Sequence, residues 1–218
     1  METIPDIIRG FRAADGEVLR IAGVEAEPFA AVDPRHLRVE AAAGASARIV
    51  VLHTAPDVSS LTLTLAEGAQ LELTELFTAE AFAEVSVKQA ARSRCRLTTV
   101  LLSSANASYR IDLDGADAEN ELGGVFLAAG EELLSRTARI TTQPQLEIYA
   151  DDVKCSHGAT VGQMDAEAIL YMRQRGLSEA QARRLQIEGF VGDVVTRCGI
   201  EPLCGAILER AAAKIETL

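Results

Sequence analysis

Large aromatic residues are scarce in this sequence. Tryptophan is absent, and aromatic residues make up 4% of the 218 positions. The hydrophobic content, 48% of the chain, therefore rests on smaller side chains, which suits thin layers filled by Leu, Val, Ile and Ala. A chain of this length can bury a substantial core in one domain, with or without a helical appendage.

Cysteine is also scarce. The four cysteines lie at positions 95, 155, 198 and 204, too few and too scattered for a disulfide framework. Cys198 and Cys204 are separated by five residues, which is not the spacing of a zinc ribbon, a ferredoxin or a thioredoxin. We expect reduced thiols, with Cys95, Cys198 and Cys204 acting as packing residues.

Several sequence signals of function are missing. No G-x-x-x-x-G-K-[ST] loop occurs, so the chain itself does not look like an ATPase. No apolar run reaches the length of a membrane span, and the start METIPDIIRG lacks the basic and apolar regions of a signal peptide. The net charge of −11 argues against nucleic acid or an anionic membrane as a partner. We expect a soluble, acidic, cytoplasmic protein.

The middle of the chain alternates between apolar and polar residues with a period of two, which predicts β-strands. The expected strands are 47–53, 61–65, 71–77, 83–88, 95–102, 109–113 and 121–127. Small-residue turns separate them and recur about every 24 residues, near Gly44, Gly68, Arg92 and Gly115. Such a period favours a solenoid, in which each coil buries its apolar face against its neighbours. A β-sandwich is the rival interpretation, because it also gives short, regularly spaced strands.

The last part of the chain has helical signals. Asp165 is a good N-cap for a helix that ends at Gly176, and its apolar stripe would include Ile169, Leu170 and either Tyr171 or Met172. Ser178, with Gln181 in the reciprocal position of a capping box, begins a second helix. A third is expected over about 202–216. We expect these helices to cover the open edge strand of the solenoid, and they could also dock a partner.

The run LEIYADDVKCSHGATVG (146–162) concentrates polar, chemically active residues between a strand and a helix. If 153–157 is extended, Cys155 and His157 share a face, and a thiol beside an imidazole can begin a site for a transition metal. The pair alone is a weak signal, because a buried thiol and a hydrogen-bonded histidine give the same pattern. Asp151 and Asp152 point to opposite faces of a strand, so we expect no joint catalytic role. We expect His36 and His53, each isolated, to be structural or surface residues.

The segment PQLEIYADDVKCSHGATVG (144–162), with the capped helix and the Arg175-Gly176 turn after it, resembles the SufB/SufD family of iron–sulfur cluster assembly proteins. The close resemblance covers roughly the last third of the chain. Gly158 stands where the SufB-like branch has a glutamate, which favours the SufD-like branch. The N-terminal helical region of the family is nearly absent, and coils are expected to be missing near Glu132 and Leu133.

The resemblance implies a fold, a site and partners. The fold is a mainly β, right-handed parallel β-helix with C-terminal α-helices, divided into a short N-terminal segment (1–36), a β-helix core (37–162) and a helical region (163–218). His157, with Cys155, is expected to supply part of a metal site shared with a partner subunit. The implied partners are a SufB-like paralogue and a SufC-like ABC ATPase, with a homodimer allowed for the isolated chain.

The implied function is that of a non-enzymatic scaffold. An iron–sulfur cluster would be assembled transiently in the complex, with no cofactor firmly bound to this chain alone; the resemblance does not establish a flavin. Arg173 and Arg175 are candidate partner-binding residues, although a solvated helix face is the simpler interpretation. The alternatives are a carbohydrate-active β-helix enzyme and a purely structural homo-oligomer. Against the enzyme, the strands carry no cluster of acidic and aromatic residues that would bind a sugar.

Overall fold

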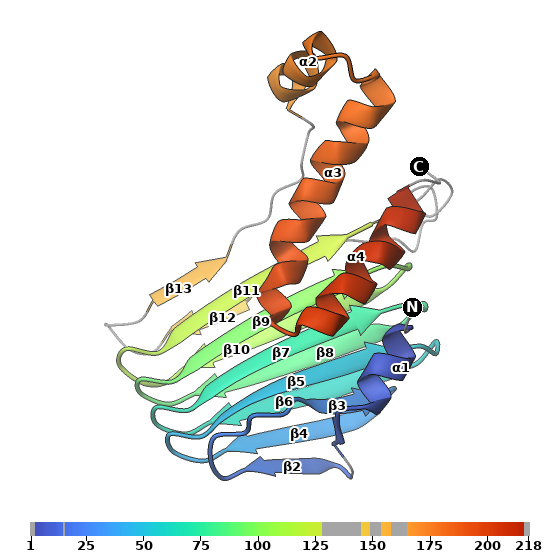
Figure 1. Cartoon of the computed structure of the whole chain (residues 1–218). Coiled ribbons are helices and arrows are strands. Elements are labelled where there is room, and N and C mark those ends of the chain that lie inside the picture. The colour runs from blue at the N-terminus through green and yellow to red at the C-terminus, as the bar shows by residue number, and fades with distance from the viewer. Residues whose placement is uncertain (1–2, 15, 128–144, 149–153, 158–164, 216–218) are drawn as a thin grey trace.

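A computed structural model describes residues 3–14, 16–127, 145–148, 154–157 and 165–215 (Figure 1). The N-terminal elements in chain order are α1 (Ile4–Arg9), β1 (Arg12–Ala13), β2 (Val18–Ile21), β3 (Phe29–Val32) and β4 (His36–Ala41). The longer strands are β5 (Ser46–His53), β6 (Val58–Leu65), β7 (Gln70–Phe77), β8 (Phe82–Gln89), β9 (Arg94–Leu101), β10 (Asn106–Leu113) and β11 (Glu119–Phe126). The C-terminal elements are β12 (Gln145–Ile148), β13 (Lys154–His157), α2 (Ala166–Gln174), α3 (Glu179–Val195), η2 (Thr196–Cys198) and α4 (Glu201–Ile215).

The described strands form two parallel sheets, which confirms the solenoid and not the sandwich. One sheet has the order β1-β3-β5-β7-β9-β11-β13, and the other has the order β12-β10-β8-β6-β4-β2. Successive coils place Ser46 beside Gln70, Gln70 beside Arg94, and Arg94 beside Glu119. The period expected from the sequence is thus the spacing between stacked strands of one sheet.

The coils begin earlier than the sequence indicates. Strands β1, β2 and β3 all precede residue 37 and belong to the same two sheets as the strands of the expected core. The first coils are shorter, since Val18 pairs with Arg38 and Phe29 pairs with Ile49. Their strands are also short, two residues in β1 and four in β2. A different period and such brief alternation leave little pattern for sequence analysis to detect.

One corner of the solenoid repeats a left-handed residue in each coil. Gly44 and Gly68 both have φ of 68°, and Arg92 and Asp117 follow with φ of 57° and 56°. The stacking expected at Gly44 and Gly68 is present, because the Gly44 N–H donates to Glu67 O and the Gly68 N–H donates to Ala91 O. In the last of these turns the left-handed residue is Asp117 and not Gly115, the position expected from the sequence, since this coil is one residue longer.

Gly115 is required at the same corner for a different reason, which is the close approach of the coil below it. A Cβ added to Gly115 would lie 2.0 Å from Ala91 N and 2.4 Å from Ala91 Cα. We expect Gly115→Ala to lower the free energy of unfolding by about 1–3 kcal/mol, measured by urea denaturation, because the backbone must shift. Gly23→Ala is the matched control, since nothing lies within 4 Å of its added carbon. Equal losses in the two variants would contradict the close-approach explanation.

The space between the two sheets is filled by aliphatic side chains. This inner core takes alternate residues of each strand, including Ile49 and Val51 of β5 and Leu61 and Leu63 of β6. Each of these side chains is at most 1% exposed. The alternation identified in the sequence therefore marks the interior of the coils.

The outer face of the odd-numbered sheet is also apolar, and helices cover it (Figure 1). We call this set the outer cluster. From the sheet it takes Ala30, Val50, Leu52, Leu76, Val100 and Val125, with Leu102 and Leu127 directly after β9 and β11. Its helical members come from α1, from α4 and from the last turns of α3, with Cys198 and Ile200 between the two long helices.

Two sequence expectations about the helices are wrong. The helices lie across the face of the sheet and do not cover its edge strand, because the C-terminal halves of β5, β7 and β9 are buried on both sides and carry apolar side chains on the outer one. The stripe expected on α2 is not buried either. Ile169 is 8% exposed, but Leu170 and Tyr171 are 54% and 55% exposed.

The expected helix boundaries are confirmed. The Asp165 carboxylate accepts hydrogen bonds from the backbone N–H groups of Glu167 and Ala168, and Ser178 and Gln181 form the capping box. Gly176 follows α2 with φ of 97°, the left-handed conformation that ends a helix. Among the described residues, no helix is long and apolar enough to cross a membrane.

Candidate functional site

The expected metal ligands lie on β13, at the end of the odd-numbered sheet in the described part of the chain. In the parallel pairing of β11 with β13, Cys155 lies beside Asn120 and His157 lies beside Leu122. The strand character of 154–157 is thus confirmed. The side chains of Cys155 and His157 fall outside what the structure describes, as do Asp151, Asp152, Glu132 and Leu133, so the shared metal site stays a prediction.

Below β13 the interior of the last coils becomes polar. Asn120 is 4% exposed, and its amide donates to Gln89 Oε1 at 2.7 Å. Gln89 in turn donates to the carbonyl of Glu119 at 3.0 Å and to the Ser93 hydroxyl at 3.3 Å. Asn120 Oδ1 accepts no hydrogen bond from a described residue. The backbone of Cys155 therefore lies next to a fixed amide network rather than next to an aliphatic core.

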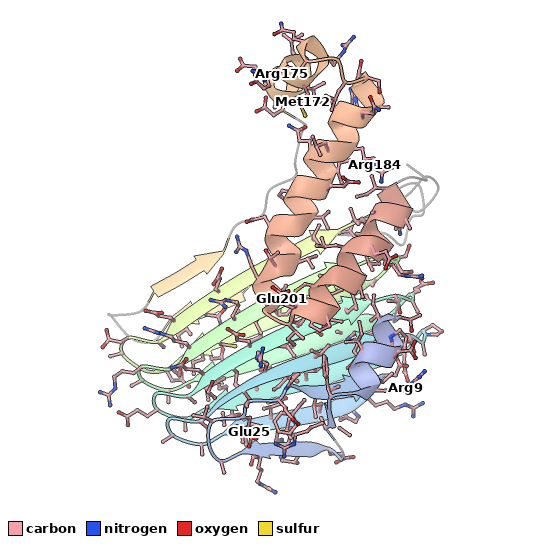
Figure 2. All side chains as sticks on the ribbon, viewed as in Figure 1. Arg9, Glu25, Met172, Arg175, Arg184 and Glu201 are labelled. Carbon is pink, nitrogen blue, oxygen red and sulfur yellow. The ribbon has the colours of Figure 1, made fainter. Side chains whose placement is uncertain are left out.

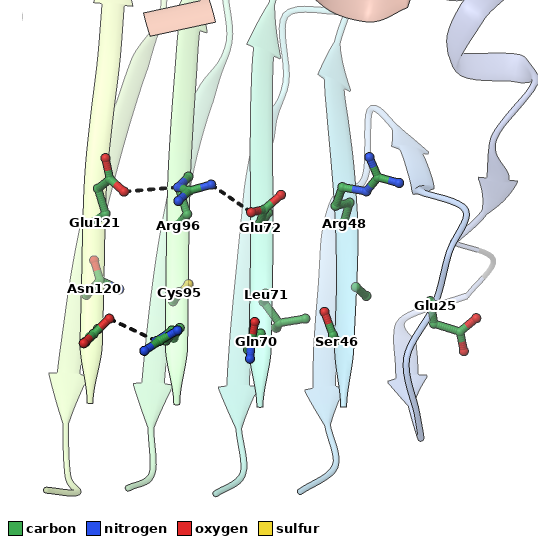
Figure 3. Close-up of a pocket in the computed structure, with 13 residues that line it drawn as sticks. Glu25, Ser46, Arg48, Gln70, Leu71, Glu72, Cys95, Arg96, Asn120 and Glu121 are labelled. Carbon is green, nitrogen blue, oxygen red and sulfur yellow. Dashed lines mark hydrogen bonds and ion pairs between the residues drawn. The ribbon is translucent and has the colours of Figure 1, made fainter. Parts of the chain in front are cut away.

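A groove of about 770 Å³ crosses the uncovered half of the odd-numbered sheet (Figure 3). Charged side chains of opposite sign alternate across it from strand to strand. Arg96 donates to Glu121 at 3.1 Å and to Glu72 at 2.8 Å. One row nearer the corner, Arg94 pairs with Glu119 at 3.0 Å.

Two arginines join this groove to the segment between α3 and α4. Arg197 of η2 donates to Glu121 Oε1 at 2.8 Å. Arg48 of β5 donates to the carbonyl of Gly199 at 3.1 Å and to that of Ala26 at 2.8 Å. The carboxylates of Glu72, Glu119 and Glu121 are each paired with an arginine. Through Arg197 and Arg48 the groove therefore fixes η2 and the residue after it on the sheet.

The cysteines with described side chains are packing residues, as expected. Cys95, Cys198 and Cys204 are buried free thiols. Burial raises the pKa of Cys95 from 9.0 to about 12, and burial followed by the neighbouring Cys204 raises that of Cys198 to about 11. Since a thiolate is the nucleophile and the metal ligand, the thiols of Cys95 and Cys198 are unreactive near neutral pH. Among described side chains, no group of three or more His, Cys, Asp and Glu residues is arranged to hold a metal.

The candidate partner-binding residues lie on an arm made of α2 and the first turns of α3. Figure 2 shows Met172 and Arg175 at the end of this arm, away from the sheets. Arg173 pairs with Glu179 at 3.4 Å, and the Arg175 guanidinium lies over the Tyr171 ring at 4.6 Å. Both arginines therefore have partners within the chain, and the large exposed side chains beside them are apolar, Leu170 and Tyr171.

One buried polar cluster was not identified from the sequence as a unit. His36 is exposed, but His53 is 3% exposed and faces the carboxylate of Glu75. That carboxylate accepts a hydrogen bond from the Tyr109 hydroxyl, which in turn hydrogen-bonds to Thr99. Burial, followed by the Glu75 charge, raises the pKa of Tyr109 well above 10.0, so its hydroxyl remains a donor. The available signal in the sequence was Glu75, which takes an inward position of β7 between Leu73 and Phe77 in the alternation.

The family comparison identifies the region that contains β12 and β13. Residues 132–190 match the family described as "SUF system FeS cluster assembly, SufBD core domain". This match and the curated relatives support membership of the chain in the SufB/SufD family. This confirms the resemblance seen in the Cys155–His157 motif, which lies within the match.

Curated relatives of this family agree with the assignment. The chain is 38% identical over 109 residues to the "Iron-sulfur cluster assembly protein SufD" of Escherichia coli K12, a match that covers 50% of this chain and 23% of that protein. It is 45% identical over 75 residues to an "Iron-sulfur cluster assembly SufBD family protein" of Synechocystis, covering 34% of this chain and 17% of the relative. The chain thus spans less than a quarter of the length of these relatives.

Proposed function

We propose that this chain is a SufD-like, non-enzymatic scaffold component of a SUF-type iron–sulfur cluster assembly complex. The observation that carries the proposal is the SufBD core match over 132–190, which contains the Cys155–His157 strand. The proposal places the chain in the cytoplasm.

The position of β13 supports a shared site with a SufB-like partner. β13 ends its sheet in the described chain, so its outer edge has backbone N–H and C=O groups available for another strand. A strand added there would bring partner residues beside Cys155 and His157. Neither residue alone completes a metal coordination sphere, and a partner would supply the remaining ligands.

The arm supports a contact with a SufC-like ATPase. It extends away from both sheets and carries exposed apolar residues beside arginines that are held in place by Glu179 and Tyr171. Movement of the ATPase would shift the equilibrium between two arrangements of the complex, which is how ATP binding could expose the interfacial site.

Arginine charge reversal tests the arm contact. We expect Arg173→Glu with Arg175→Glu to weaken co-purification with the ATPase, more strongly at low salt. The double variant loses two positive charges at the edge of the contact, and it loses the Arg175 guanidinium that lies over the Tyr171 ring. The matched control reverses Arg20 and Arg35, which pair with Glu40 and Asp57 on the solenoid surface. Unchanged association of the arm variant at low salt would remove these two arginines from the interface.

Iron and sulfide content after co-expression tests the function as a whole. We expect a purified complex of this chain with its SufB-like and SufC-like partners to carry cluster, and the chain alone to carry none. A stable homo-oligomer that recruits neither partner would instead favour the structural alternative. Glycan cleavage by the chain alone would favour the enzyme alternative.

A further inference from the structure

The interior of the solenoid contains a buried imidazole and a buried carboxylate that face each other. His53 is the last residue of β5, and Glu75 lies on β7, the next strand of the same sheet. Their side chains are 3% and 1% exposed. Burying such groups among aliphatic side chains is costly unless their polar atoms are satisfied.

Neighbouring residues hold both groups in fixed orientations. The Tyr109 hydroxyl of β10 donates to Glu75 Oε2 at 2.6 Å, and the Thr99 hydroxyl of β9 hydrogen-bonds to Tyr109. The His53 ring stacks on Phe77 with a centroid separation of 4.2 Å and an interplanar angle of 16°. Four strands thus preorganise one imidazole and one carboxylate.

The two atoms that face each other make no hydrogen bond. His53 Nε2 and Glu75 Oε1 are 3.5 Å apart, and neither has a hydrogen-bond partner among the described residues. This separation is long for a hydrogen bond between a nitrogen and a carboxylate. It does suit two ligands of one ion, because bonds of 2.0–2.2 Å to a shared metal would subtend roughly 110–120°.

We propose that His53 Nε2 and Glu75 Oε1 ligate a first-row divalent transition metal ion inside the solenoid. Imidazole and carboxylate donors suit Fe²⁺ or Zn²⁺. Tyr109 holds the ligating carboxylate as outer-shell partners of metal sites do. Structural zinc sites use four protein ligands, whereas the described residues supply two here, so water or another small donor would complete the coordination of the ion. The proposal is independent of the Cys155–His157 edge.

Cobalt titration of the full chain tests this site, since Co²⁺ substitutes for Zn²⁺ or Fe²⁺ and has visible absorption that reports its ligands. The titration uses chelator-treated protein with Cys155→Ser and His157→Ala, which removes the candidate ligands of β13. We expect one equivalent of Co²⁺ to bind and to be displaced by Zn²⁺. His53→Gln and Glu75→Gln should each abolish binding, whereas His36→Gln, at an exposed histidine of β4, should leave it unchanged.

Tyr109→Phe provides a second variant if loss of either ligand unfolds the chain. It keeps both ligands and removes the hydrogen bond to Glu75, so we expect binding to weaken by about 10- to 100-fold. Absence of Co²⁺ binding in the background protein would overturn the proposal in favour of a buried ion pair. Binding that survives both ligand substitutions, or that is unaffected by Tyr109→Phe, would overturn it as well.

Discussion

Replacing Ile207 by aspartate is expected to detach α4 from the sheet and cause the chain to aggregate. Ile207 is 0% exposed and belongs to the outer cluster, where α4 packs against the sheet. An unpaired carboxylate there would be buried among aliphatic side chains or would force the helix away. We expect the free energy of unfolding to fall by about 4 kcal/mol or more, which is a large share of the stability of an ordinary domain.

Chemical denaturation and size-exclusion chromatography measure this effect. Leu170→Asp is the matched control, because it makes the same kind of change at a helix position that is 54% exposed. The control should unfold at the wild-type denaturant concentration. Similar losses in both variants would mean that α4 does not protect the sheet.

The same packing limits how the ATPase contact can be tested. Removing all residues after 163 would delete the arm, but it would also uncover Val50, Leu52, Leu76, Val100 and Val125 on the sheet. A truncated chain that fails to bind would then report aggregation as readily as a lost interface. Substitutions confined to α2 avoid this ambiguity, since Leu170 and Tyr171 lie outside the outer cluster.

We expect His157→Ala to lower the cluster yield of the assembled complex by about tenfold or more, with no change in the melting temperature of the isolated chain. Loss of a single metal ligand should cost at least as much as loss of a ligand's hydrogen-bond partner, about 10- to 100-fold. The backbone of His157 pairs with Leu122 at the sheet edge, where a partner strand can approach. An imidazole there could ligate iron or relay a proton near neutral pH.

Cysteine variants serve as comparisons for His157. Cys198→Ala and Cys204→Ala should leave the yield unchanged, because these thiols are buried between the helices and the sheet. Cys155→Ala should have a smaller effect than His157→Ala. A fall in the melting temperature of His157→Ala would make this residue a core histidine. A normal yield would leave it without a role in assembly.

The repeating part of the fold could be predicted from the sequence because each coil repeats one physical requirement. Alternation fixes which side chains face inward, and the small corner residues at Gly44 and Gly68 set the period. Capping residues Asp165 and Ser178 likewise fixed where the helices begin, since each satisfies backbone N–H groups a few positions away.

The features that were missed depend on contacts between coils or between layers. His53 and Glu75 face each other across strands that are adjacent in space but separated in sequence by a whole turn. The covering of the sheet face by α3 and α4 follows from apolar residues on both sides of β5, a pattern that also fits a fully buried strand. The roles of Arg173 and Arg175 depend on Glu179 and Tyr171, which only the folded arm brings into contact.

The contact between α1 and α4 has a consequence for how the chain folds. Each coil touches mainly the coils next to it, so the solenoid could grow step by step as the polypeptide is synthesised. Helix α1, near the start of the chain, packs with α4 near its end in one apolar cluster. Helix α1 must therefore wait for α4 before its isoleucines are shielded from water. This late packing step would make the coils unfold as one cooperative unit. A destabilising substitution in α1 or α4 would then lower the stability of all the coils.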